Sequence, residues 1–329
     1  PGFIDTQVNG GAGVLFNDAP NLSSIAAIGR AHRRYGTTGF LPTLISDDLD
    51  KLALALDAVE AACQAQLPGV LGIHIEGPFL NPVKKGVHDA SKFQRLNAHT
   101  VALLSRLKNG RTLLTLAPEC NDVEHIRALT QAGVIVSAGH TDASFECMQI
   151  ALENGVRGFT HLFNAMSGLQ SRAPGVVGAA LLDKASWCGI IADAVHVHPA
   201  SLQLALRCKP KELFMLVTDA MPAVGNGLAD FQLQGKTIHI ENGVCVDEHG
   251  TLAGSVLDMA SAVRNAVKFL DVDLIDALRM ASLHPAQFLG VDHELGQIKP
   301  GYRANLVALD ESLHVQASWI DGACEDYRS

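Results

Sequence analysis

Two kinds of segment alternate along this chain. Short runs of β-branched and aliphatic residues are followed by stretches in which apolar residues recur with the period of an α-helix. The run SIAAIGRAHRRYG is one example, because Ile25, Ile28 and Ala31 fall on one face of a helix, with Arg30 and Arg34 on the other. This alternation predicts repeated βα units and therefore a parallel sheet.

The pattern predicts eight strands with helices between them. The expected strands cover residues 2–8, 39–44, 70–75, 113–117, 134–138, 156–160, 189–192 and 213–218. The expected helices cover residues 23–35, 49–66, 98–108, 123–132, 145–154, 176–182, 199–206, 259–270 and 274–283. An open doubly wound sheet usually has a glycine-rich phosphate turn after its first strand, and the turn here, NGGAG, lacks that fingerprint. We therefore predict an α/β fold, a closed (β/α)8 TIM-type barrel.

Two segments depart from the alternation. Residues 228–252 are predicted to form β-hairpins, with turn signals at Asn242-Gly243 and His249-Gly250. Beyond Pro285 the pattern indicates short strands that are too few for a stable sheet of their own. The expected domains are thus a barrel over residues 1–285 with hairpin insertions, and C-terminal strands over residues 286–329. Because the sequence starts without a methionine, we expect a segment before Pro1 to supply further strands.

Composition and charge exclude several classes of protein. With 48% hydrophobic, 18% charged and 5% aromatic residues, the 329-residue chain is typical of a globular protein with an aliphatic core. No apolar run approaches the ~18 residues of a membrane span, and no secretory signal opens the chain. A net charge of −9 argues against a nucleic-acid partner. Seven dispersed cysteines, without a CxxC motif, favour reduced thiols and a cytoplasmic location.

Chemically competent side chains follow the expected strands. The reactive residues of a βα barrel come from the C-terminal ends of its strands. Glu76 (GIHIEGP), His140 (VSAGH), His161 (THLFNAM), His196 (ADAVHVHP) and Asp219 (LVTDAMP) all stand at such ends. Taken singly, each has an ordinary explanation, such as a cap for a following turn or a core histidine. Their joint placement on one rim favours a functional site.

The residue types indicate metal-dependent hydrolysis. Glu76, His140 and His161 offer one carboxylate and two imidazoles, which is the ligand set of catalytic zinc hydrolases with an open coordination position. Zinc is favoured, and iron(II), cobalt and manganese also suit this set. Asp219 is the expected general base and acid. His88, in the loop KKGVHD, and His196 are expected to orient or polarise the scissile oxygen.

The order and spacing of these motifs resemble a known family. They read PGFIDTQVNG, GIHIEGPFLNPVKKGVH, LAPE, VSAGHTDA, THLFNAMSG, RAPGVVGA, GIIADAVHVHP, LVTDAM and DEHGTLAGS. Over nearly the whole chain this pattern is similar to the N-acetylglucosamine-6-phosphate deacetylases of the amidohydrolase superfamily. The resemblance implies hydrolysis of the N-acetyl group of N-acetylglucosamine 6-phosphate to glucosamine 6-phosphate and acetate, in amino-sugar catabolism or cell-wall sugar recycling. It also implies that the C-terminal strands are part of a small β-sandwich, only partly present in this chain.

The resemblance assigns roles to individual residues. It implies metal binding by Glu76, His140 and His161, and the acid and base role of Asp219. It implies substrate contacts at Val87, His88, Asn164, Ala165, Arg172, His196, Leu252, Ala253 and Gly254. In the family, the arginine that matches Arg172 comes from the neighbouring subunit and holds the phosphate, for which a guanidinium is well suited. We therefore expect a homo-oligomer, either a dimer or a dimer of dimers.

The number of metals follows from a comparison within the superfamily. Many amidohydrolases carry His-x-His after strand one and a carboxylated lysine at strand four, which together build a two-metal site. This chain has Gln7-Val8-Asn9 after strand one, and strand four ends in Glu119. We expect one metal per subunit, with Gln7 in its surroundings at a vestigial metal position.

Two other functions compete with this interpretation. A different amidohydrolase, such as a cyclic amidase or imidase, would use the same barrel and metal, although Arg172 and the missing second-metal ligands argue against it. A sugar-phosphate sensor without activity would be expected to lack Asp219 or a metal ligand, and all of these are present. The sequence does not distinguish N-acetylglucosamine 6-phosphate from N-acetylgalactosamine 6-phosphate, or acetyl from other acyl groups.

Overall fold

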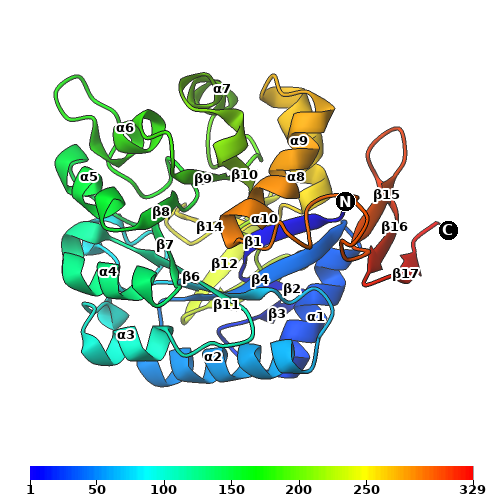
Figure 1. The fold of residues 1–329 in the computed structure, drawn as a ribbon, viewed down its shortest axis with the longest axis horizontal. Helices are drawn as coiled ribbons and strands as arrows, with labels where there is room; N and C mark the ends of the chain where they lie inside the picture. Colours follow the sequence, from blue (N-terminus) through cyan, green and yellow to red (C-terminus); the bar gives the residue numbers. More distant parts are fainter. Residues whose placement is uncertain (329) are drawn as a thin grey trace.

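The computed structural model describes residues 1–328, and within them eight parallel strands form one sheet. Its order is β1-β4-β5-β6-β7-β8-β9-β10. The strands are β1 (Phe3–Val8), β4 (Thr37–Ile45), β5 (Gly72–Glu76), β6 (Arg111–Leu116), β7 (Ile135–Ala138), β8 (Val156–Phe159), β9 (Trp187–Ile190) and β10 (Phe214–Leu216). All eight coincide with the predicted strands to within a few residues. Figure 1 shows them in the middle of the molecule, with helices around them.

The sheet closes on itself between its first and last strands. A parallel bridge joins Val8 to Ala220, beyond β10. The Asp219 N–H donates to the Gln7 carbonyl over 3.0 Å, and the Asn9 N–H donates to the Ala220 carbonyl over 2.9 Å. These contacts make the sheet a barrel and confirm the predicted TIM-type fold. They also place the residues after β10 beside the residues that end β1.

The barrel strands are buried and the helices cover them. The helices are α1 (Leu22–Arg33), α2 (Leu49–Gln64), α3 (Ala98–Leu104), α4 (Val123–Gln131), α5 (Phe145–Glu153), α6 (Gly175–Leu182), α7 (Pro199–Cys208), α8 (Met259–Phe269), α9 (Leu274–Met280) and α10 (Leu283–Leu289). In α1 the Asn21 side chain accepts the N–H of Ser24, which caps the helix. Ile25 and Ile28 on its inner face are completely buried. The predicted helical stripe therefore faces the sheet.

Helix α10 lies across residue 285, where we expected the barrel domain to end. Pro285 is the third residue of α10, in the first turn, where a proline removes no hydrogen bond that the helix needs. Phe288 is fully buried, with its ring centre 6.2 Å from that of Trp187 in β9. The last helix of the barrel region thus extends to Leu289. A short hairpin of β2 (Gly10–Gly11) and β3 (Val14–Leu15) after β1 was not predicted.

Two small antiparallel sheets complete the described chain. The predicted hairpins form a four-stranded sheet of β11 (Asp230–Leu233), β12 (Lys236–Glu241), β13 (Val244–Val246) and β14 (Leu252–Ser255). The C-terminal strands β15 (Leu306–Leu309), β16 (Val315–Ile320) and β17 (Ala323–Asp326) form the second sheet. Figure 1 shows this second sheet on the side of the barrel where the N-terminus lies. No helix within residues 1–328 is long and apolar enough to cross a membrane.

The C-terminal sheet is fastened to the barrel by one buried arginine. Arg33, at the end of α1, is only 7% exposed. Its Nε donates to Ser318 Oγ over 3.1 Å, its Nη2 donates to the Ala323 carbonyl over 2.6 Å, and its Nη1 lies 2.8 Å from Glu325 Oε1. A guanidinium with several partners holds both β16 and β17 in place.

Candidate active site

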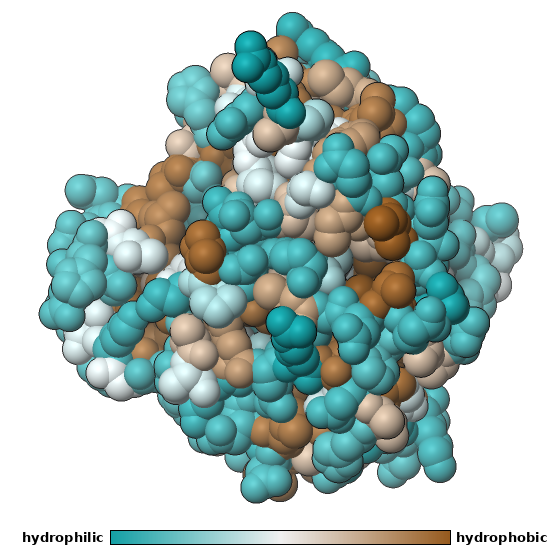
Figure 2. Space-filling view, turned by 90° about the vertical axis from the view of Figure 1, so that its left-hand side faces the viewer, coloured by the Kyte–Doolittle hydropathy of each residue, from teal (hydrophilic) through white to brown (hydrophobic). Residues whose placement is uncertain are grey.

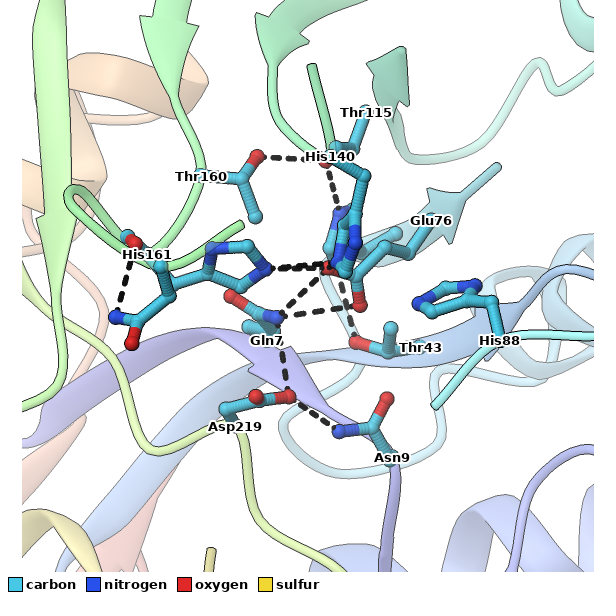
Figure 3. Close-up of polar contacts among 12 residues, drawn as sticks. Gln7, Asn9, Thr43, Glu76, His88, Thr115, His140, Thr160, His161 and Asp219 are labelled. Carbon is cyan, nitrogen blue, oxygen red and sulfur yellow. Dashed lines mark hydrogen bonds and ion pairs between the residues drawn. The ribbon is translucent and has the colours of Figure 1, made fainter. Parts of the chain in front are cut away.

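Three strand ends deliver one carboxylate and two imidazoles to a single point. Glu76 is the last residue of β5, while His140 and His161 each follow a strand, β7 and β8, by two residues. One potential ligand atom from each lies within 4.8 Å of the others, and all three residues are buried. Figure 3 shows the three side chains pointing toward one another. The predicted ligands are therefore brought together.

The backbone at these positions is unusual. His140 has φ of 48°, His161 has φ of 34°, and Asp219 has φ of 52°, all in the left-handed region that residues other than glycine rarely adopt. Such conformations carry a cost and are concentrated at functional sites, where the surrounding structure enforces them. Here they turn each side chain inward just as its strand ends.

The spacing of the three ligand atoms suits a divalent cation. Glu76 Oε1 lies 2.9 Å from His161 Nε2 and 3.3 Å from His140 Nε2, and the two imidazole nitrogens are 3.1 Å apart. Ligand atoms at ~2.0 Å from a tetrahedral metal lie roughly 3.3 Å from one another. The donor set and its dimensions therefore fit a single zinc-like ion.

A neighbouring carbonyl orients one of the ligands. His140 Nδ1 lies 2.8 Å from the carbonyl oxygen of Lys84, which only accepts hydrogen bonds. His140 Nδ1 therefore carries the proton, and its Nε2 presents a lone pair to the cluster. Ligating histidines are commonly held through the second ring nitrogen in this way.

The carboxylate of the cluster is held in its charged form. Burial raises the pKa of Glu76, but hydrogen bonds from His140 and His161 outweigh that effect and hold the pKa well below its usual range. Gln7 Nε2 also donates to both Glu76 oxygens, over 3.3 and 3.2 Å. An anionic Glu76 is the form that binds a cation.

Gln7 also connects the cluster to Asp219. Its Nε2 lies 3.0 Å from Asp219 Oδ1, and Asn9 Nδ2 donates to the same oxygen over 2.6 Å. Both bonds go to Oδ1, which leaves Asp219 Oδ2 free to take a proton. Burial, and next the charge of Glu76, raise the pKa of Asp219 to about 6. A carboxyl group with that pKa can exchange a proton near neutral pH.

His88 lies beside the cluster as a neutral ring. Its centre is 4.4 Å from that of His140, and its Nδ1 lies 2.8 Å from Ser46 Oγ. The Ser46 N–H also points at Nδ1, over 3.4 Å, so Nδ1 is an acceptor and the proton is on Nε2. Burial, and next the proximity of His140, lower the pKa of His88 to about 3. Figure 3 shows the ring facing the cluster from the side.

His196 is fixed by an acidic neighbour. His196 Nδ1 donates to Asp193 Oδ2 over 2.6 Å, and the His196 backbone N–H donates to Asp193 Oδ1 over 2.9 Å. Burial raises the pKa of Asp193, but the hydrogen bond from His196 outweighs it and lowers the pKa. The ring of His196 is thereby held at the mouth of the barrel.

A row of buried polar side chains lies next to the cluster inside the barrel. His74 Nδ1 is 3.2 Å from Thr43 Oγ1, His74 Nε2 is 2.8 Å from Thr115 Oγ1, and Thr115 Oγ1 is 2.6 Å from Thr160 Oγ1. Burial lowers the pKa of His74 to about 4. The row connects four strands, β4, β5, β6 and the end of β8, and two of these, β5 and β8, carry Glu76 and His161.

The cluster opens into a cavity of about 360 Å³. Glu76, His140, His161, Asp219 and Asn9 line it. Seven of the predicted substrate contacts also line it, namely Val87, His88, Asn164, Ala165, His196, Leu252 and Gly254. Its volume suits a ligand of the size of a sugar.

Two predicted contacts lie elsewhere. The side chain of Ala253 is completely buried and packs in a small hydrophobic cluster with Leu15, Ile45 and Met221. Arg172 is exposed and lines a second cavity with Lys84 and Asp142. In this single chain, the guanidinium is therefore outside the cavity that holds Glu76.

Several exposed apolar side chains belong to α5, to α6 and to the loop before α6 that carries Arg172. Leu169 is 62% exposed, Leu182 at the end of α6 is 64% exposed, and Ile150 in α5 is 53% exposed. Figure 2 shows the side of the molecule that carries α3 to α6, where brown apolar areas lie between hydrophilic ones. Exposed apolar area of this kind marks candidate interfaces between proteins.

Sequence reasoning gave no role to several residues of the site. Asn9 directly follows β1, and Ser46 directly follows β4. Their positions at strand ends are the sequence signals that could have indicated a role in the site. No role was predicted for Lys84, but its carbonyl orients His140 and the residue lines the cavity. A backbone contact of that kind leaves no mark in the residue pattern.

Comparison with known proteins identifies the family. A model described as the amidohydrolase family matches residues 1–326. The chain belongs to the amidohydrolase family. Metal-dependent hydrolysis by members of this family agrees with the cluster of Glu76, His140 and His161.

Within this family the chain is similar to deacetylases of amino-sugar phosphates. It is 46% identical to an N-acetylgalactosamine-6-phosphate deacetylase of Shewanella sp. (strain ANA-3), across 98% of this chain and 81% of that protein. It is 35% identical to an N-acetylglucosamine-6-phosphate deacetylase of Haemophilus influenzae, across 98% of this chain and 84% of that one. The crystal structure of N-acetylglucosamine-6-phosphate deacetylase from Pasteurella multocida superposes with a TM-score of 0.96 at 35% identity, over 99% of this chain and 86% of that one.

Proposed function

We propose that the protein hydrolyses the N-acetyl group of N-acetylglucosamine 6-phosphate, releasing glucosamine 6-phosphate and acetate. The observation that carries the proposal is the meeting of Glu76, His140, His161 and Asp219 at one cavity. This cavity lies in a chain that is similar, over nearly its whole length, to proteins that remove acetyl groups from such sugars. The reaction belongs to amino-sugar catabolism or cell-wall sugar recycling.

Glu76, His140 and His161 would hold one divalent cation per subunit, with zinc favoured over iron(II), cobalt and manganese by the ligand set. When bound, such a cation supplies Lewis acidity and makes water more acidic. Gln7 occupies the position of a second-metal ligand in related enzymes. Because its Nε2 donates to Glu76 and Asp219, it acts as a hydrogen-bond donor, which supports a single metal.

Asp219 is the proton carrier of the reaction. Its Oδ2 accepts a proton from water as the water oxygen bonds to the acetyl carbon. Asp219 then passes this proton to the sugar nitrogen, and the C–N bond breaks to give the free amine and acetic acid, which loses its remaining proton to water as acetate. Gln7 and Asn9 hold Oδ1 throughout, so the carboxylate keeps its orientation as it gains and loses the proton.

His88 and His196 act on the substrate. The neutral His88 ring has its proton on Nε2 and donates it as a hydrogen bond to the acetyl oxygen, where negative charge develops. His196, held by Asp193, contacts the sugar and helps to orient the scissile bond. The further contacts we propose are five residues that line the cavity, Val87, Asn164, Ala165, Leu252 and Gly254, together with Ala253, which stands between the last two in the chain.

We propose a homo-oligomer, a dimer or a dimer of dimers, in which Arg172 holds the phosphate of the substrate bound by its neighbour. Arg172 is exposed and lies outside the cavity of its own chain, in a loop that also carries the exposed Leu169. A guanidinium matches a phosphate in charge and geometry. The site would therefore be complete only across the interface between subunits.

A cytoplasmic location agrees with the cysteines. All seven are free within the described structure, although Cys208 and Cys324 are exposed. Free thiols at the surface persist in a reducing compartment. Titration of the protein under denaturing conditions, without reductant, should find seven thiols per chain, and disulfides in freshly isolated protein would contradict this location.

N-acetylgalactosamine 6-phosphate is a second candidate substrate. The specific observation in its favour is the 46% identity to the Shewanella deacetylase, against 35% to the Haemophilus enzyme. The two sugars differ only in the configuration of one hydroxyl group. The acetamido group and the phosphate are common to both, so the same residues would act on either.

Two assays test the proposal. Acetate release is measured for N-acetylglucosamine 6-phosphate, N-acetylgalactosamine 6-phosphate and unphosphorylated N-acetylglucosamine, and ring opening is measured for a cyclic imide. We expect kcat/KM for the phosphorylated sugars to exceed that for the free sugar by at least about a hundredfold, because an unpaired phosphate site loses charge-assisted hydrogen bonds. Equal rates with and without phosphate would contradict the role of Arg172. Hydrolysis of the imide alone would indicate a different amidohydrolase, and sugar-phosphate binding without turnover would indicate a sensor.

A further inference from the structure

One hydrogen-bonding side chain joins the four-stranded sheet to the part of the site that holds His88. Gln234 forms the turn between β11 and β12 and has φ of 50°. We propose that Gln234 is a positioning residue that fixes His88 in its working place, and this rests on the deacetylase function proposed above. Figure 1 shows β11 and β12, in yellow, near β4.

Gln234 uses both ends of its amide group. Its Nε2 donates to the Ser46 carbonyl over 2.5 Å, and its Oε1 accepts the backbone N–H of Asp89 over 2.9 Å. Both partners are backbone groups. If Gln234 is replaced, Ser46 and Asp89 therefore cannot restore the lost hydrogen bonds by rotating their side chains. The pair of bonds also fixes which way the amide faces, because a carbonyl accepts and an N–H donates.

Both partners of Gln234 are next to His88, one as its neighbour in the chain and the other as its hydrogen-bond partner. Asp89 follows His88 in the chain, and Ser46 makes the hydrogen bond to His88 Nδ1 that sets its tautomer. Ser46 directly follows β4, whereas His88 and Asp89 belong to the loop after β5. Gln234 therefore spans two segments whose separation determines the position of the His88 ring.

The sheet that carries Gln234 is itself firmly seated. Leu233 is 1% exposed and packs with Ile45 and Met221 in the same small hydrophobic cluster that contains Ala253. Leu233 also lines the active-site cavity. The turn is thus an anchored support for the loop. Besides the contacts of Ser46 with His88 Nδ1, an ion pair between Lys92 Nζ and Asp48 Oδ2 joins the same two segments over 2.6 Å. This pair lies at the surface, where it contributes little.

Two variants separate this role from a general effect on folding. Gln234→Ala removes both bonds, and Gln234→Glu keeps an acceptor for the Asp89 N–H but sets a carboxylate oxygen against the Ser46 carbonyl. Gln232→Ala is the matched control, because Gln232 is an exposed glutamine of the same hairpin that bonds only Thr237. Acetate release and hydrogen–deuterium exchange of the peptide that contains residues 85–93 are measured for each.

We expect both Gln234 variants to lose about tenfold or more in kcat, with KM changed less than about threefold and unchanged metal content, because His88 acts on the transition state. In a His88→Gln background, the further loss from Gln234→Ala should shrink to within about twofold, since coupled residues are not additive. The 85–93 peptide should exchange faster in Gln234→Ala than in Gln232→Ala. Equal kcat in Gln234→Ala and the wild type, or the same loss with and without His88, would overturn the proposal.

The two proposals fail in different ways. If the wild type releases no acetate from any sugar phosphate, the proposed function is wrong. The exchange measurement still decides the positioning role in that case, because it reports the loop without any turnover. Identical exchange in Gln234→Ala and Gln232→Ala would then reject it, and faster exchange in Gln234→Ala alone would support it.

Discussion

Asn9 donates its side-chain N–H to Asp219 Oδ1 over 2.6 Å, although the two residues are 210 positions apart in the chain. The contact exists because the residues after β10 lie beside the end of β1, where the barrel closes. Asn9 is 1% exposed and lines the cavity. A buried donor at this distance stabilises the carboxylate form of Asp219, which is the form that accepts a proton.

Replacing Asn9 by aspartate should move the pH dependence of the reaction. Asn9→Asp has the same shape but sets a second carboxyl group against Asp219, and like charges raise the pKa of the pair. Because Asp219 must be deprotonated to act as the base, the acidic limb of kcat/KM should move to higher pH, by about one pH unit or more. The profile from pH 4.5 to 9 checks this, and superimposable profiles of variant and wild type would show that Asn9 does not act on Asp219.

Mixing two inactive variants tests the role of Arg172 across the interface. Asp219→Asn should lose about a hundredfold to ten-thousandfold in turnover while it still binds metal and substrate. Arg172→Ala should lose most of its activity through a raised KM. In a mixed dimer, one site keeps its own Asp219 and receives Arg172 from the partner subunit, so random pairing of equal amounts should restore ~25% of the wild-type rate. Mixed dimers without recovered activity would place the phosphate contact within one chain.

The buried Asp5 predicts a pH dependence of stability. Asp5 accepts from Thr218 Oγ1 over 2.5 Å where the barrel closes, and burial raises its pKa to about 7. The usual pKa is about 4, so between these values the native state binds more protons than the unfolded chain, and Asp5 makes stability fall as pH rises.

Asp5→Asn removes this titration. The unfolding free energy of the wild type minus that of the variant should therefore decrease between about pH 4 and pH 7, by a few kcal/mol at most. Denaturant titrations at several pH values measure this difference. A difference that rises with pH would mean that folding lowers the pKa of Asp5.

Arg33 should contribute to stability and not to catalysis. Arg33→Met keeps much of the side-chain volume but leaves the Ala323 and Ser318 carbonyls without their donor. We expect a loss of about 2 to 4 kcal/mol in unfolding free energy. Acetate release at 25 °C should be unchanged, because Arg33 lies outside the active-site cavity. Arg34→Met, at the exposed neighbouring position, is the control and should change stability by less than about 0.5 kcal/mol.

Much of the barrel was predictable because its signals are local. Each strand is a short apolar run, most helices have one apolar face, and the ligands Glu76, His140 and His161 lie at the end of a strand or two residues beyond it. Helix α10 was not predicted, because the expected helix ended at residue 283 and the pattern beyond Pro285 was interpreted as short strands. Pro285 lies in the first turn of α10, where a helix tolerates proline.

The contacts between distant residues were beyond the sequence pattern. The bond from Asn9 to Asp219 depends on how the barrel closes, and the bond from Gln234 to Ser46 depends on how the hairpin sheet folds back over the strand ends. Likewise, the residue pattern around Arg172 does not by itself place the side chain outside the cavity of its own chain, which only the family resemblance implied. These features arise from tertiary packing, where residues far apart in the sequence meet.

The most direct test of the account is a metal titration of stripped protein with N-acetylglucosamine 6-phosphate as substrate. Acetate release should be absent without metal and should rise in proportion to added Zn²⁺ until it saturates at one ion per chain. In Glu76→Gln, which keeps the shape but not the charge, saturation should require far more metal. Full activity without metal, or saturation only at two ions per chain, would contradict the single-metal site of Glu76, His140 and His161.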